Sequence, residues 1–188
     1  HDKSRGVEFL TVLNNNLASL RLMASNHNVY LSSEFFAFSF EEQINKAKFA
    51  DRGFPVLAEQ LAEVRLIVTP LLEANITRLM GVRRSKTPDD ADSSPYCHRL
   101  PRMPDPDLHL VISPYEVTFY AFSAEIGQVL ENLCNAEKFI AVKSVVLNHE
   151  ADLKGPSPIP GAQPLPRSGL RPGGAAPRVI RFGTMLRP

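Results

Sequence analysis

YEVTFYAFSAEIGQVLENLCNAEKFIAVKSVVL, residues 115–147, is the stretch that decides the fold class. Apolar and polar side chains alternate from 115 to 122, which predicts a strand with one buried face. Ser123 is of a type that caps helices, and Glu125 favours the positive end of the helix dipole, so a helix is expected next. β-branched residues from 139 to 147 predict another strand. The order strand–helix–strand predicts an α+β fold.

The first 27 residues have the pattern of an amphipathic helix. Apolar residues recur at steps of three and four, the stripe that a helix buries: Val7, Leu10, Leu13, Leu17, Leu20 and Ala24. The helix is expected to end at Asn26–Asn28, because asparagine tolerates turn conformations. The stripe is narrow enough either to pack on a sheet or to continue upstream as a coiled coil.

Aromatic and β-branched residues gather in Val29–Leu31 and Phe35–Phe40, which predicts two short strands or one broken strand. A second amphipathic helix is expected over Val56–Glu73, where the apolar positions are Leu57, Leu61, Val64, Val68 and Leu71. Pro70 removes a backbone hydrogen bond and is expected to kink this helix or to end it early. Ile76–Arg83 then predicts a strand.

Two segments are rich in turn-forming residues. Residues 85–107 hold five prolines and five aspartates, which predicts a long loop between two halves of the chain, and Leu108–Ile112 a short strand after it. Residues 155–177 are too rich in proline and glycine to bury a core of their own. Val179–Leu186 alternates again, so it is expected to return to a sheet edge as a tethered last strand.

The two helix–strand passages resemble each other: Leu72 and Leu133 near the helix ends are each followed, seven residues later, by Leu79 and Ile140 in a strand. We therefore predict two ferredoxin-like βαβ-type units in tandem behind an N-terminal helix. The expected division is 1–27 for the helix, 28–85 for the first unit, 86–107 for the loop, 108–150 for the second unit, 151–177 for the linker and 178–188 for the last strand.

The charge distribution and the number of cysteines limit the classes of protein to which this chain can belong. Residues 155–188 carry five arginines and no acid, so the first 154 residues have a net charge of −4 against +5 for the tail. A body of that sign gives no electrostatic reason to expect nucleic acid on the folded face. Cys97 and Cys134 are too few for a disulfide framework, and they are equally compatible with a single bridge or two free thiols.

No motif for phosphate binding, nucleophilic catalysis or zinc-dependent hydrolysis occurs, so we expect neither catalytic nor cofactor-binding residues. Cys97, His98 and His109 come nearest to a metal cluster, but their spacing matches no standard zinc site, and no metal is expected. Asp89, Asp90 and Asp92 lack the glycine and the terminal glutamate of a calcium loop, so we interpret them as a solvated acidic loop.

Other polar and aromatic features have structural interpretations. Asn75-Ile76-Thr77 is a formal glycosylation sequon, but its place at a helix–strand junction favours a helix-ending asparagine. The tail arginines are spread among Pro and Gly and are expected to keep an edge strand soluble. The aromatic group lies on both faces of its predicted strand, with one face in the core and the other available to the first helix or a partner subunit: Phe35, Phe36, Phe38 and Phe40.

Several short sequence segments resemble those of PilO-like type IV pilus assembly proteins, including the pilus-associated members of mucin-degrading gut bacteria. The first half is similar through Leu61-Ala62-Glu63-Val64 and Val82-Arg83. The second half is similar through residues 115–119 and 139–145, and the Pro-rich insert before a last strand is also shared. The resemblance covers about residues 7–150 and the last ten.

This resemblance implies a non-catalytic periplasmic scaffold, anchored in the inner membrane by a helix upstream of this sequence, which forms homo- or heterodimers and contacts other pilus subunits. It implies no site residues and no cofactor. One alternative is a ferredoxin-like regulatory module that binds a small ligand between subunits. Another is an enzyme that uses His109 or His149 with a nearby acid.

Overall fold

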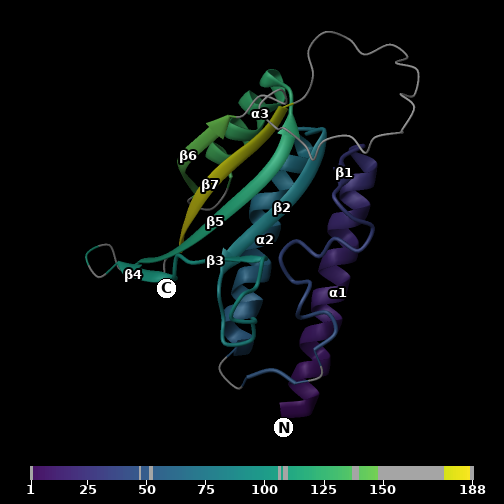
Figure 1. Cartoon of the computed structure of the whole chain (residues 1–188), viewed down its shortest axis with the longest axis vertical. Coiled ribbons are helices and arrows are strands. Elements are labelled where there is room, and N and C mark those ends of the chain that lie inside the picture. Colours follow the sequence, from purple (N-terminus) through teal and green to yellow (C-terminus); the bar gives the residue numbers. More distant parts are fainter. Residues whose placement is uncertain are drawn as a thin grey trace, which may run out of the picture.

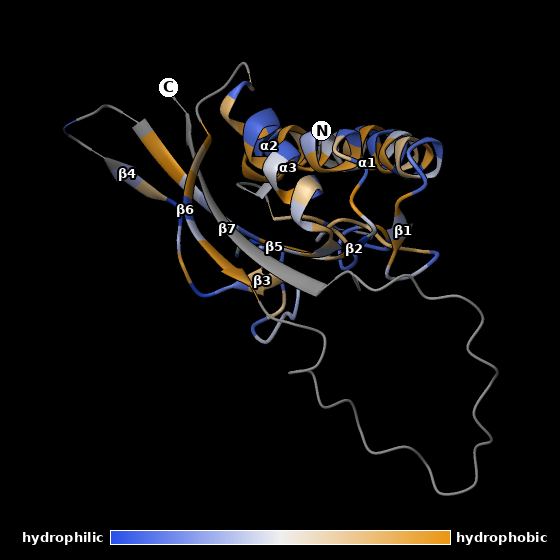
Figure 2. Cartoon of the chain, turned by 90° about the horizontal axis from the view of Figure 1, so that it is seen from above, coloured by the Kyte–Doolittle hydropathy of each residue, from blue (hydrophilic) through white to orange (hydrophobic). Residues whose placement is uncertain are grey.

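The computed structural model of the chain describes residues 2–46, 48–50, 53–105, 107, 110–136, 140–147 and 176–186. In this part the fold is mixed α+β, and three helices cover one face of a mixed sheet (Figures 1 and 2). The helices are α1 (Asp2–Asn26), α2 (Gly53–Glu73) and α3 (Ser123–Cys134). The strands are β1 (Tyr30–Leu31), β2 (Arg78–Ser85), β3 (Cys97–His98), β4 (Met103–Asp105), β5 (Leu110–Ala121), β6 (Ile140–Leu147) and β7 (Ala176–Leu186).

The strand order across the sheet is β1-β2-β5-β7-β6, with β3 added to β2 and β4 added to β5. β1 and β3 run parallel to β2, while the β2–β5, β4–β5, β5–β7 and β7–β6 pairs are antiparallel. β1 and β2, which flank α2 in the chain, are therefore direct neighbours. β5 and β6, which flank α3, are parallel to each other but separated by β7.

The last strand does not lie where the sequence predicted. β7 was expected at a sheet edge, yet it pairs with β5 along eleven residues and with β6 on its other side. β5 and β6 are parallel and stand one strand apart, so a strand between them that runs in the opposite direction can pair antiparallel with both. β7 takes this position. The edge on this side of the sheet is β6.

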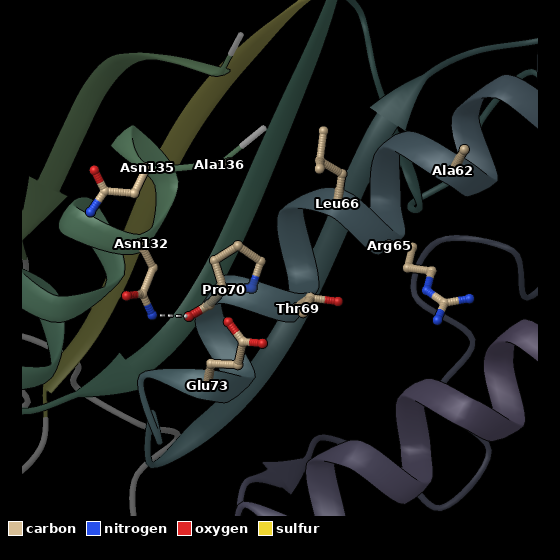
Figure 3. Close-up of a pocket in the computed structure, with 9 residues that line it drawn as sticks. All are labelled: Ala62, Arg65, Leu66, Thr69, Pro70, Glu73, Asn132, Asn135 and Ala136. Atoms are coloured by element: carbon tan, nitrogen blue, oxygen red, sulfur yellow. Dashed lines mark hydrogen bonds between the residues drawn. The ribbon is translucent and has the colours of Figure 1, made fainter. Parts of the chain in front are cut away.

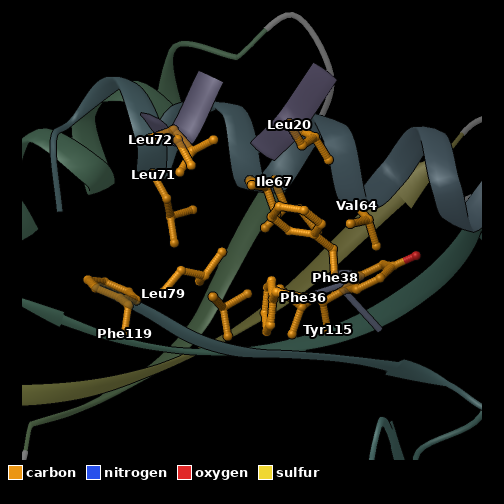
Figure 4. Close-up of a cluster of buried hydrophobic side chains, with 14 of the residues drawn as sticks. Leu20, Phe36, Phe38, Val64, Ile67, Leu71, Leu72, Leu79, Tyr115 and Phe119 are labelled. Carbon is orange, nitrogen blue, oxygen red and sulfur yellow. The ribbon is translucent and has the colours of Figure 1, made fainter. Parts of the chain in front are cut away.

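The main core lies between the helices and the sheet (Figure 4). All five predicted apolar positions of α2 are buried, and so are four of the six predicted on α1: Leu13, Leu17, Leu20 and Ala24. Val7 is an exception at 67% exposure, and Phe9 takes its place by packing edge-on against Phe49 and Phe54. α1 ends as predicted, with Asn28 in the left-handed region at φ 55°.

Phe35–Phe40 forms no strand, so this prediction is wrong. The segment is a buried turn, in which Phe38 and Ser39 adopt φ values of 52° and 84°. Phe36, Phe38 and Phe40 point into the core, whereas Phe35 is 76% exposed. The backbone carbonyls of Phe36 and Ser39 accept hydrogen bonds from Arg21 and Arg84. Aromatic richness therefore indicated burial, but side-chain donors rather than a neighbouring strand satisfy this backbone.

The central strand is longer than predicted. β5 runs without interruption through Pro114, where two separate strands were expected. Pro114 lies opposite Gly183 of β7, and the carbonyl of Pro114 accepts a hydrogen bond from His98. The predicted loop at 85–107 likewise contains two short strands, β3 and β4, that fasten it to the sheet.

The helix ends also differ from expectation. Pro70 does not end α2, which continues to Glu73, and Asn75 then adopts φ 54° as the predicted helix-ending residue. The cap of α3 is Phe122 and not Ser123; its backbone N–H donates to Glu125 Oε2 at 2.8 Å. Glu125 thus stabilises the helix start, as the dipole argument predicted.

The α+β class is confirmed, whereas the tandem ferredoxin-like arrangement is not, because strands from both predicted units join one sheet. The division of the chain into domains stays a prediction. Among the described residues, no helix combines the length and the hydrophobicity needed to cross a membrane.

Candidate interaction surface

A buried arginine organises one end of the helix-covered face. Arg84 of β2 is fully buried, and its guanidinium makes a bidentate ion pair with Asp90 at 2.6 and 2.8 Å. The same guanidinium donates to Gln60 of α2, Gln43 and the carbonyl of Ser39. Burial would raise the pKa of Asp90, but the Arg84 charge and the hydrogen bonds from Arg84 and Thr87 bring it below its usual value. These groups are fully engaged with one another.

Asp89 fastens the same loop to the start of α2. Its Oδ1 accepts from Lys46 Nζ and from the Ala50 backbone N–H, both at 2.9 Å. Its Oδ2 lies 1.7 Å from the place where a Cβ on Gly53 would be, so any larger residue at this position would force the Asp89 carboxylate to move. Asp92 pairs with Lys86. The three aspartates are thus divided among three different cations. The prediction of a solvated acidic loop is wrong for Asp89 and Asp90, whose side chains are buried, and it fits only the exposed Asp92.

A second polar cluster links α2 to β5. Glu63 is buried, and it accepts from the hydroxyls of Tyr115 at 2.5 Å and Ser113 at 3.1 Å. Arg102 lies within 3.6 Å of Glu63 and makes a 2.8 Å ion pair with Glu59. Burial raises the pKa of Glu63, although these partners oppose the rise, and burial raises that of Tyr115 well above its usual range. The cluster therefore connects α2 to β5.

Cys97 and His98, the residues that came nearest to a metal cluster in the sequence, form the short strand β3. Burial raises the pKa of the Cys97 thiol, which keeps it protonated at neutral pH. His98 Nε2 bonds the Pro114 carbonyl at 2.7 Å while Nδ1 accepts from the Leu100 N–H, so its ring is the neutral Nε2–H tautomer. Burial lowers its pKa accordingly. No metal-binding group of His, Cys, Asp or Glu occurs among the described residues, and His109 and His149 lie outside them.

The remaining sequence candidates are also placed. Cys97 is buried, Cys134 is exposed and both are free thiols, so no bridge joins them. Asn75 is exposed and its Oδ1 lies 2.9 Å from His27 Nδ1. Arg178 and Arg181 lie in β7, which pairs with β5 on one side and β6 on the other, so the prediction that they protect an edge strand is wrong. The other tail arginines lie outside the described residues. Sequence reasoning missed Arg84 and Glu63; the alternation Val82–Arg84 was the signal that put Arg84 on the core face.

A groove of about 670 Å³ lies between α2 and α3 (Figure 3). Asn132 of α3 lines the groove, and its side-chain amide donates a hydrogen bond to the Pro70 carbonyl of α2 at 3.1 Å. Arg65 and Glu73 are the charged residues that line it, and Arg65 is bonded to Asn16 of α1. The groove is open to solvent.

The other prominent surface feature is the outer edge of β6. Its carboxyl half exposes three consecutive apolar residues, Val145, Val146 and Leu147, at 37%, 43% and 54%. β6 is the last strand on this side of the sheet order. The buried ionisable groups thus pair with one another inside the fold, whereas the carboxyl half of β6 exposes apolar side chains.

Comparison with known proteins gives a fold match. No known family and no curated protein matches the sequence. Three similar solved structures are of a pilus-associated protein of Akkermansia muciniphila. The first has a TM-score of 0.67 at 11% identity and covers 96% of this chain and 76% of that chain. The second, described as a core domain, has a TM-score of 0.67 at 12% identity, with coverages of 96% and 86%.

The third structure is described as lacking its transmembrane region, and it has a TM-score of 0.64 at 12% identity, with coverages of 94% and 82%. At such identities the likeness is one of fold. The narrower prediction of a PilO-like protein is not confirmed.

Proposed function

We propose that this chain is a non-catalytic subunit of a type IV pilus or a related secretion assembly, and that it acts through protein–protein contacts. The observation that carries the proposal is the fold likeness to the Akkermansia muciniphila pilus-associated protein, which extends over 94–96% of this chain. Fold alone does not assign function, so the surface must support the same conclusion.

The distribution of polar groups supports a contact function. The buried ionisable residues pair with each other across elements: Arg84 with Asp90, and Glu63 with Tyr115. Such pairs position a loop and a helix, whereas a catalytic group must face a substrate. The apolar residues on the outer edge of β6 supply the kind of surface that partner proteins cover.

A periplasmic location, with an inner-membrane anchor outside these 188 residues, belongs to the same proposal. One of the similar structures is described as lacking a transmembrane region, which supports an anchored arrangement by analogy. The proposal requires about 20 consecutive apolar residues upstream in the complete reading frame. A complete frame without them would remove the anchor from the proposal.

The test is cross-linked purification from the source bacterium. The full-length chain, tagged and expressed at its natural level, is cross-linked in cells, purified from the membrane fraction and analysed by mass spectrometry. We expect enrichment of type IV pilus or secretion-system assembly subunits over an unrelated tagged periplasmic protein. Enrichment of no assembly subunit would contradict the proposal. A metabolite that co-purifies and raises the unfolding temperature would favour the ligand-binding module instead.

A further inference from the structure

A pocket of about 630 Å³ lies where the carboxyl end of β2 meets β3 and the loop residues on either side of β3. Its volume is typical of sites that hold small ligands. Among the described residues that line it, Arg83, Lys86 and Arg99 are cations and Asp92 is the one acid. The lining therefore has a net formal charge of +2, in a chain whose first 154 residues have a net charge of −4.

The two arginines of this pocket have N–H donors that no described residue accepts. Arg99 is exposed, and it makes no hydrogen bond or ion pair within the described part of the chain. Arg83 Nη2 donates to the Cys97 carbonyl at 2.9 Å, while Nη1 lies 3.4 Å from Glu116 Oε1, a long distance for a hydrogen bond. The Arg83 Nε–H is buried without an acceptor among the described residues. Since a guanidinium has five donors in a fork that fits anionic oxygens, both side chains can bind a further acceptor.

Lys86 is held by a partner that a ligand can replace. Its ammonium group pairs with Asp92, whose side chain is fully exposed to solvent. Such an exposed pair is worth little, because water screens it and both side chains lose conformational freedom. An anion with more charge than one carboxylate can therefore displace Asp92 from Lys86. His98 adds no charge to the lining, because both nitrogens of its neutral ring are bonded to the backbone.

We infer that this pocket binds a phosphate monoester, whose oxygens accept hydrogen bonds from Arg83, Lys86 and Arg99. A phosphate monoester carries a charge of about −1.5 to −2 at pH 7 and three acceptor oxygens, so it matches both the +2 of the lining and its three cations. A carboxylate has a single charge and two oxygens, which one arginine fork already satisfies. The hydroxyls of Ser93 and Ser94 are further donors in the lining. The inference goes beyond the proposed function and does not depend on it.

The test is isothermal titration calorimetry of the purified chain with glycerol 3-phosphate, at about 0.15 M ionic strength so that distant charges are screened. Wild type is expected to show saturable binding at a single site. Arg99→Gln is expected to weaken this binding about tenfold or more in Kd, because a charged donor to the phosphate is lost. Arg78→Gln is the matched control, since Arg78 is exposed on the same strand as Arg83 and lies outside the pocket. Its Kd is expected to stay within about twofold of wild type.

Asp92→Asn separates binding from folding, because a damaged fold cannot improve affinity. This variant removes the carboxylate that competes for Lys86, so it is expected to bind glycerol 3-phosphate about two- to fivefold more tightly. Vesicles of phosphatidylcholine with phosphatidic acid, compared with phosphatidylcholine alone, present the same phosphate monoester on a lipid. Co-sedimentation with these vesicles that Arg99→Gln weakens, without binding of the soluble ester, would assign the phosphate to a lipid headgroup.

Three results would overturn the inference. They are the absence of binding to both phosphate monoesters, including the case in which a glutamate-rich peptide binds instead, an Arg99→Gln variant that binds as tightly as wild type, and an Asp92→Asn variant that binds more weakly. None of them bears on the contacts of the chain with assembly subunits, which cross-linked purification measures separately.

Discussion

Arg83 and Arg84 are adjacent in β2 and have opposite surroundings. The Arg84 side chain is completely buried against Asp90, whereas the Arg83 side chain is 43% exposed and pairs with Glu116 at 3.4 Å. Removing one partner of a buried ion pair leaves the other charge desolvated and unpaired, which is costly. Loss of an exposed pair costs little, because solvent already screens it.

Arg84→Met is therefore expected to lower the free energy of unfolding by about 3–5 kcal/mol. Arg83→Met, the matched control, is expected to lower it by about 1 kcal/mol or less. Urea unfolding followed by circular dichroism measures both. Equal losses for the two variants would show that the Arg84–Asp90 pair does not fasten the loop to the sheet.

The absence of a side chain at Gly53 makes room for the Asp89 carboxylate. Gly53→Ala puts a Cβ within 1.7 Å of Asp89 Oδ2, so the carboxylate has to leave its bonds to Lys46 and Ala50. A loss of about 1–3 kcal/mol in unfolding free energy is expected. In an Asp89→Ala background the same change is expected to cost little, since the obstructing atoms are gone. Additive losses in this double-mutant cycle would refute the explanation.

At the scale of elements, Glu63 joins α2 to β5 and gives this contact a pH dependence. Burial raises the pKa of Glu63 in the folded state, and the facing groups are Tyr115, Ser113, Arg102 and Glu59. A group whose folded pKa is raised contributes stability below its unfolded pKa, and this contribution is lost as pH rises through the folded pKa.

Glu63→Gln removes this titration and is measured against wild type by urea unfolding at pH values from 4 to 7. The difference in unfolding free energy is expected to shift in favour of Gln as pH rises, because only wild type loses the Glu63 contribution. Thr11→Ser, on the exposed side of α1, serves as a control with a pH-independent difference. A Glu63→Gln difference that stays constant or falls would contradict the raised pKa.

Sequence periodicity predicted the helices and strands that bury one face. It failed for segments whose conformation or position depends on contacts with residues distant in the sequence. The α2 stripe and the alternation in β5 follow directly from burial of one face. Phe35–Phe40 has the composition of a strand, but its backbone bonds to Arg21 and Arg84, which come from distant elements. The position of β7 between β5 and β6 depends on a pairing between strands far apart in sequence. A local sequence pattern can predict neither the partners of the Phe35–Phe40 backbone nor the position of β7 in the sheet.

The candidate sites divide in the same way. The helix-ending role of Asn75 followed from its position before a strand. The partners of Asp89 and Asp90 could not be predicted, because Lys46 and Arg84 approach them only in the folded chain.

For the whole molecule, we propose that the buried ionisable groups stabilise the fold while exposed surfaces make contacts in a pilus-type assembly. The most direct test is the number of surface pili, counted by electron microscopy, in a deletion strain of the source bacterium. We expect deletion to remove the pili, and both wild type and a folded Cys97→Ser/His98→Gln double variant to restore them. Normal piliation after deletion, or failure of the folded double variant to restore pili, would contradict the account.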